Sequence, residues 1–87
     1  MSDIKEFIIE YLYNNSDKNN LVTIHEIKDN SRYSWEAISR NMKELLDGEY
    51  VLKSKIKKKI YNPRTGKYVF VNTTLDGFTL NPKRLED

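Results

Sequence analysis

Residues 34–51 read SWEAISRNMKELLDGEYV and predict an amphipathic helix around which the other elements are arranged. The apolar residues of this stretch recur at offsets 0, 4, 7 and 8, the spacing of one stripe on a helix with 3.6 residues per turn; they are Ile38, Met42, Leu45 and Leu46. Ser34 is the expected N-cap, and Gly48 stands near the far end, where a glycine can adopt the left-handed conformation that closes a helix. The sequence therefore predicts a helix over residues 34–47.

The opposite face of this helix is polar and predicts a recognition surface. It carries Glu36, Ser39, Arg40 and Lys43, which can donate and accept hydrogen bonds at base edges and phosphates. Further candidates stand at or just before the helix start, namely Arg32, Ser34 and Trp35. For Trp35 two roles are equally open, because the ring can stack on a base or sugar, or anchor the helix on the core.

Composition limits the chain to one small domain, which we expect over residues 1–80, with a short flexible tail over 81–87. The 87 residues are 38% apolar, enough for one compact core. Cysteine is absent, so disulfides and thiolate metal sites are excluded. The N-terminal residues include Asp3, Glu6 and Glu10 and no long apolar run, so we expect neither a signal peptide nor a membrane span, and a cytoplasmic protein.

Charge is distributed unevenly along the chain. Residues 1–50 hold six Lys or Arg against ten Asp or Glu, and residues 51–87 hold nine against three, so the two parts carry −4 and +6. Residues 51–67 contain seven basic side chains and no acid, a local field suited to a polyanion. A simpler role stays open, because lysines also keep an edge strand soluble and unaggregated.

The residues before the recognition stretch predict two further helices. A first helix is expected over residues 2–13, followed by a polar loop over 14–20 and a short extended step at residues 21–22. Thr23 and Glu26 form the pattern of a capping box, which predicts a short helix over residues 24–29 and a turn over 30–33.

After Val51 the apolar period changes from 3.6 to 2, which predicts a β-hairpin with strands over residues 53–60 and 67–71. The connecting residues NPRT, 62–65, and Gly66 match a type I turn closed by a bulge. Alternation puts four lysines on one face (Lys53, Lys55, Lys57 and Lys59) and three apolar residues on the other (Leu52, Ile56 and Ile60). Arg64 and Lys67 flank the tip, and the Asp76-Gly77 pair predicts a turn into a third short strand.

This order of elements resembles the winged helix-turn-helix DNA-binding superfamily over residues 3–73. The matching positions lie within ISRNMKELLDGEYV; they are Ile38, Ser39, Arg40, Met42, Leu45, Tyr50 and Val51. Where the superfamily pattern has a glycine, this chain has Glu49, and its glycine stands one residue earlier. The resemblance implies an α+β fold of three helices followed by a Lys-rich β-hairpin wing. It also implies a transcriptional regulator of duplex DNA, with residues 34–47 in the major groove and a wing, residues 51–73, on the backbone or minor groove.

Other functions find less support in the sequence. A phosphate-cradling glycine loop, a nucleophile elbow and a metal-ligand cluster are all missing, so we expect no enzyme, catalytic residue, cofactor, metal or small-molecule ligand. The competing function is a winged-helix adaptor that binds protein or RNA. The wide apolar surface of the first helix further predicts a homodimer with Phe7, Ile8 or Tyr11 in its interface.

Overall fold

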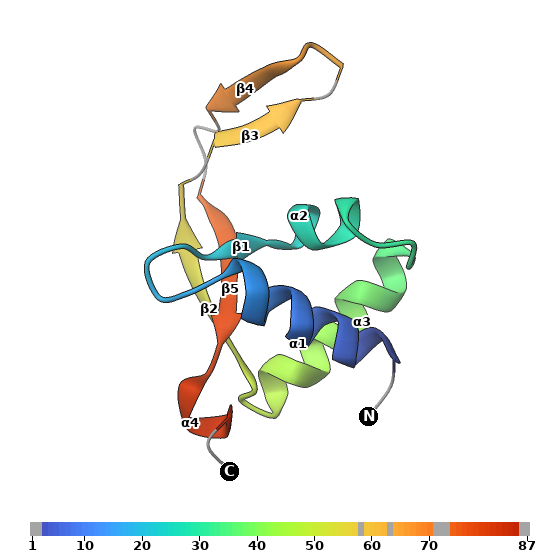
Figure 1. The fold of residues 1–87 in the computed structure, drawn as a ribbon, viewed down its shortest axis with the longest axis vertical. Coiled ribbons are helices and arrows are strands. Elements are labelled where there is room, and N and C mark those ends of the chain that lie inside the picture. The colour runs from blue at the N-terminus through green and yellow to red at the C-terminus, as the bar shows by residue number, and fades with distance from the viewer. Residues whose placement is uncertain (1–2, 58, 63, 71–73, 86–87) are drawn as a thin grey trace.

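The structure is a computed structural model that describes residues 3–57, 59–62, 64–70 and 74–85. The fold is α+β, and its elements follow one another as shown in Figure 1. In chain order they are α1 (Asp3–Asn15), β1 (Val22–Thr23), α2 (Ile24–Asp29), α3 (Trp35–Asp47), β2 (Val51–Ile56), β3 (Lys59–Asn62), β4 (Lys67–Phe70), β5 (Leu75–Leu80) and α4 (Pro82–Leu85).

The named strands form two antiparallel sheets. A three-stranded sheet has the order β1-β5-β2, so the last strand in the chain lies in the middle, and β3 pairs with β4 in a separate two-stranded ribbon. The helices α1, α2 and α3 gather beside the sheet, whereas the ribbon projects from the body at one end of the molecule (Figure 1). The principal extents of 42, 27 and 20 Å reflect this elongated shape.

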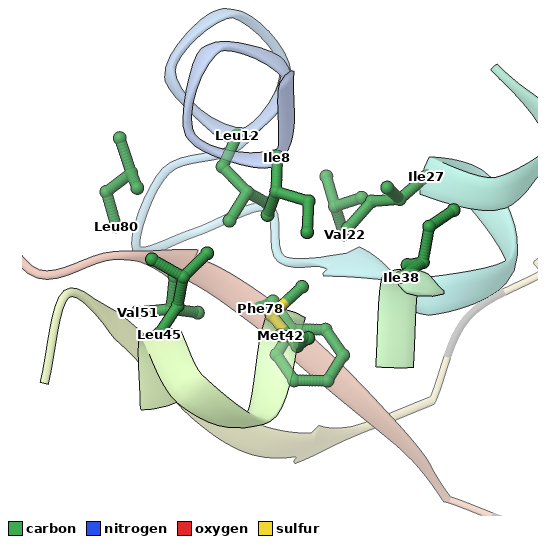
Figure 2. Close-up of a cluster of buried hydrophobic side chains, with 10 residues drawn as sticks. All are labelled: Ile8, Leu12, Val22, Ile27, Ile38, Met42, Leu45, Val51, Phe78 and Leu80. Carbon is green, nitrogen blue, oxygen red and sulfur yellow. The ribbon is translucent and has the colours of Figure 1, made fainter. Parts of the chain in front are cut away.

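The core lies between the helices and one face of the sheet (Figure 2). Its buried side chains come from six elements and are Ile8, Leu12, Val22, Ile27, Ile38, Met42, Leu45, Val51, Phe78 and Leu80. Fully burying one such aliphatic or aromatic side chain stabilises the fold by about 1.5 to 3 kcal/mol. The helical stripe expected on residues 34–47 is thus confirmed, with Leu46 packed at the margin of the core.

One residue expected at a dimer interface belongs to this core instead. Ile8 has no exposed surface, because it points from α1 into the centre of the monomer. Phe7 is half-buried, with its ring centroid 6.2 Å from that of Tyr11 and 5.7 Å from that of Tyr33. The assignment of Ile8 to an interface is therefore wrong, and the homodimer itself stays a prediction.

Side-chain caps set the starts of α2 and α3 as the sequence predicts. The amide of Thr23 donates to Glu26 Oε2 (2.8 Å), and the amide of Glu26 donates to Thr23 Oγ1 (3.3 Å), which completes a capping box. At α3 the amide of Ala37 donates to Ser34 Oγ over 3.1 Å. Each cap satisfies amides that lack a partner in the first turn of a helix.

The end of α3 differs from the expectation. Gly48 has an ordinary φ of −84°, and the left-handed conformation falls on Glu49, with φ of 62°. Glu49 therefore occupies the position at which the superfamily pattern has its glycine. The prediction that Gly48 would adopt this conformation is wrong, because α3 ends at Asp47 with Gly48 as its C-cap, and the chain turns towards β2 at the next residue, Glu49.

The C-terminal residues contact this same turn, which the sequence did not predict. The amide of Asn81 donates to the carbonyl of Tyr50 (3.0 Å), and Arg84 Nε donates to the carbonyl of Gly48 (3.1 Å). The Arg84 guanidinium also lies 4.6 Å from the centre of the Tyr50 ring. Residues 82–85 form the short helix α4, so the segment expected as a tail begins with a helical turn that packs at the end of α3.

The hairpin is built from four strands and not from two. Residues 53–60 were expected to pair with 67–71, but β2 pairs with β5 and only β3 pairs with β4. Two residues separate β2 from β3, whereas four separate β4 from β5, so the two ladders differ in register. The pairing expected for residues 53–56 is wrong because β5 carries Phe78 and Leu80, which the core needs beside Val51. Val71 and Pro63 lie outside the described residues, and Gly66 has the predicted positive φ, at 67°.

The Asp76-Gly77 pair lies inside β5 and makes no turn, contrary to the expectation. A Cβ atom placed on Gly77 would stand 2.7 Å from both Ile56 Cδ1 and Leu21 Cβ. Close packing against neighbours on both sides, and not turn geometry, explains this glycine.

We expect Gly77→Ala to destabilise the protein by about 1 to 3 kcal/mol, because the added methyl group overpacks the contact with Leu21 and Ile56. Urea denaturation followed by circular dichroism measures the change. Ser54 lies opposite Gly77 in the register and is exposed, so Ser54→Ala is a matched control with an expected effect below about 0.5 kcal/mol. Equal stability of Gly77→Ala and the wild type would contradict the close packing.

Glu49→Gly should stabilise the protein by up to about 1 kcal/mol, because a glycine removes the steric cost of the positive φ at this position. Glu49→Ala keeps that cost and removes the same carboxylate, so it separates backbone strain from charge. Thermal unfolding of the three proteins gives the comparison. A Glu49→Gly variant no more stable than Glu49→Ala would show that the turn carries no relievable strain.

Candidate nucleic-acid interface

The outer face of α3 presents the side chains that the sequence selects. The recognition candidates on and before this helix are all exposed: Arg32, Ser34, Trp35, Glu36, Ser39, Arg40 and Lys43. The inner face is fixed by the buried Ile38, Met42 and Leu45, and Asn41 is also buried, with Nδ2 donating to the carbonyl of Ala37 (2.7 Å). Because its inner face is fixed in the core, α3 holds its outer face in a defined orientation.

Trp35 makes a contact between helices, and its stacking on a base or sugar stays a prediction. Its ring meets His25 of α2 edge to face, with the ring centroids 4.9 Å apart and the planes inclined by 72°. This contact ties the start of α3 to α2. The side chain nevertheless keeps 44% of its surface exposed, so part of the ring is also accessible to a ligand.

The exposed surface of α3 carries both basic and acidic side chains. Arg40 and Lys43 are accompanied by the exposed acids Glu36, Glu44 and Asp47. Glu44 Oε2 lies 3.4 Å from Lys5 Nζ of α1, an ion pair at the side of the helix. With both signs on its surface, α3 is better suited to local hydrogen bonding than to broad attraction of a polyanion.

A basic arm, residues 51–75, supplies the strong positive charge. It holds seven Lys or Arg and no acidic residue. The described basic side chains of the arm are all exposed, namely Lys53, Lys55, Lys57, Arg64 and Lys67. Lys59 belongs to β3, and its side chain lies outside the described part of the structure.

The register of the sheet places the first two lysines of the arm on the helical side. Lys53 pairs with Phe78, and Lys55 with Asp76, so both share a face with the buried Val51. That face covers the core and carries α3. The opposite face holds Leu52, which is 45% exposed, so Lys53 and Lys55 lie with Val51 on the side of the helix layer and Leu52 does not.

Lys55 is engaged by an acid that sequence reasoning missed. Its Nζ lies 2.7 Å from Oδ1 of Asp76 on the neighbouring strand, and this oxygen is shielded from solvent. The contact with the Lys55 ammonium is the main cause that lowers the pKa of Asp76, and the charge of Lys53 acts in the same direction. The only sequence signal was that Asp76 is the first acid after an acid-free stretch, and its partner becomes evident only once β2 is paired with β5.

The described residues form neither a metal cluster nor a membrane-spanning helix. Within residues 3–57, 59–62, 64–70 and 74–85, no three His, Cys, Asp or Glu side chains come together as they would around a metal ion. In the same part of the chain, no helix has the length and apolar character needed to cross a membrane.

Comparison of the chain with protein-family models, with curated proteins and with solved structures gave no match. The function is accordingly inferred from the residues and their geometry.

Removal of the Lys55 ammonium should raise the pKa of Asp76 towards the ordinary value of about 3.9. A lowered pKa in the folded state means that the carboxylate stabilises the fold above this ordinary value and loses its contribution as the pH falls through the lowered one. Lys55→Gln should therefore show a weaker loss of stability in acid than the wild type. NMR titration of the Asp76 carboxyl carbon measures the pKa. The control variant Lys57→Gln should leave the pKa of Asp76 unchanged. An unchanged pKa of Asp76 in Lys55→Gln would show that the ion pair does not form in solution.

Proposed function

We propose that this chain is a winged helix-turn-helix protein that binds duplex DNA and regulates transcription. In this proposal α3 enters the major groove, and the basic arm, which includes the wing, contacts the phosphate backbone. The role is binding without catalysis. An α-helix fits the width of the major groove of B-DNA, which is about 12 Å.

The observation that carries the proposal is the side of the sheet on which the arm places its first lysines. Lys53 and Lys55 share the sheet face that α3 covers, although simple alternation alone leaves either face open to them. One duplex can then touch α3 and the base of the arm together. An adaptor would instead be expected to expose an apolar patch at this place.

The mixed charges of α3 and the acid-free arm favour separate roles for the two elements, base selection for α3 and phosphate contact for the arm. Arg40 can pair with guanine through two hydrogen bonds, a contact that discriminates between bases by about 1 to 3 kcal/mol. The arm lysines neutralise phosphates, which gives affinity but little base information. Lys55 contributes less to this than Lys53 or Lys57, because its ammonium is already held by Asp76.

Selection from a pool of random duplexes, followed by sequencing, tests the function directly, and we expect an enriched site. On that site Arg40→Ala should weaken binding by about 5- to 140-fold, with a much smaller effect on random duplexes, because base contacts are lost only on the selected sequence. Lys18→Ala removes an exposed positive charge from the loop after α1 and is the matched control. Equal losses on both kinds of duplex would assign Arg40 to phosphate contact.

The arm is tested in the same assay through its salt dependence. The double change of Lys53 and Lys57 to Gln should weaken the selected and the random duplexes alike. It should also make the slope of log K against log salt shallower by up to about 2 units, since each neutralised phosphate contributes about 0.9. A wild-type protein that binds no duplex, or an unchanged slope in the folded double variant, would remove the support for DNA binding.

One observation favours the adaptor as a second candidate. A mainly apolar groove of about 430 Å³ lies between the end of α1 and the strands β2 and β5, and its lining includes Tyr13, Leu52 and Pro82. Tyr13 is 72% exposed and Leu52 45%. Substitution of both by Ser would abolish binding to a protein partner but leave the duplex affinity unchanged, so this variant separates the two functions.

A further inference from the structure

The register of the β3–β4 ribbon places three aromatic positions in two neighbouring cross-strand pairs. Tyr61 lies opposite Tyr68 in the register, and Lys59 lies opposite Phe70. Because residues two apart on a strand share a face, these four backbone positions belong to the same face of the ribbon. Three of these four positions are aromatic residues and one is a lysine, in two neighbouring cross-strand pairs of the register.

Exposure of Tyr68 shows that this face is accessible at one position at least. Its side chain is 71% exposed, as much as that of Tyr13, which lies on the surface of α1. The ribbon projects from the body of the molecule, away from α1 and α3 (Figure 1). The exposed basic residues Arg64 and Lys67 lie at the turn beside it.

We propose that the ribbon is a stacking platform for unpaired bases of DNA, with the Tyr68 ring against a base. Basic residues that follow the phosphates, together with aromatic rings on which bases stack, are the recurring features of sites for single-stranded nucleic acid. The π faces of bases are accessible where the strands are unpaired and are covered by neighbouring bases within a duplex. Each strand of the ribbon has four residues, roughly 13 Å, which is about the length of three or four stacked bases.

Charge is the reason to prefer a nucleic acid over a protein as the occupant of this face. Residues 51–75 carry seven positive charges and no negative one, and the nearest following acid, Asp76, is held by Lys55. The inference rests on the proposed function and extends it, because α3 would bind the duplex while the ribbon holds a single-stranded segment next to it. The preferred ligand is then a duplex with an unpaired extension.

Fluorescence anisotropy on three labelled DNAs tests the proposal: a blunt duplex, the same duplex with a 10-nucleotide overhang, and the overhang strand alone. The wild type should bind the duplex with the overhang more tightly than the blunt one. Tyr68→Ile keeps the strand propensity but removes the ring, and should weaken binding to the overhang DNA by about 5- to 140-fold, since one stacked base contributes about 1 to 3 kcal/mol. Binding to the blunt duplex should stay unchanged, and Tyr68→Phe should bind like the wild type.

Tyr13→Ile is the matched control, because it removes an equally exposed tyrosine outside the arm and should leave the affinity for all three DNAs unchanged. Wild-type affinity of Tyr68→Ile for the overhang DNA, or equal losses on the blunt and overhang duplexes, would overturn the platform. Tight binding of the blunt duplex without preference for the overhang would also overturn it and leave the duplex-binding proposal intact. Tyrosine-dependent binding to the overhang strand without any duplex binding would support the platform and reject the duplex proposal.

Discussion

The fold depends on the burial of Phe78 and Leu80 on the central strand β5. Both side chains enter the core from a strand that lies between β1 and β2. The three-stranded sheet can therefore form only when the C-terminal part of the chain inserts β5 between these two earlier strands. Gly77 makes this possible, because any larger residue there would collide with Leu21 and Ile56. The orientation of α3 and the direction of the arm both follow from this one strand.

The return of β5 also explains how the arm is divided. The chain between β2 and β5 is longer than a simple hairpin needs, and the excess forms the β3–β4 ribbon beyond the sheet. An isolated two-stranded ribbon is only marginally stable in water. The aromatic and basic residues of the ribbon lie outside the core and add little to its stability. A ligand that covers the ribbon would account for these residues.

The body of the molecule and the arm also differ in the sign of their charged residues. The body of the molecule carries charges of both signs and an ion pair between α1 and α3, whereas every charged residue of the arm is basic and Asp76 follows directly after it. Asp76 holds Lys55 on the helical side of the sheet and at the same time reduces the charge that Lys55 offers to a phosphate. In the proposed DNA complex, affinity and base selection would thus reside in different elements and could change independently.

The sequence by itself determined the elements whose signals are local. The capping box at Thr23, the N-cap at Ser34 and the buried stripe of residues 34–47 all depend on neighbours within one or two helical turns, and the structure confirms each of them. Tertiary structure alone decided the pairing of β2 with β5, the strand role of Asp76-Gly77, the positive φ of Glu49 and the partner of Lys55. These features depend on residues 19 or more positions apart in the chain or on competition for the same core. A period of two along a strand contains no information about which distant strand lies beside it.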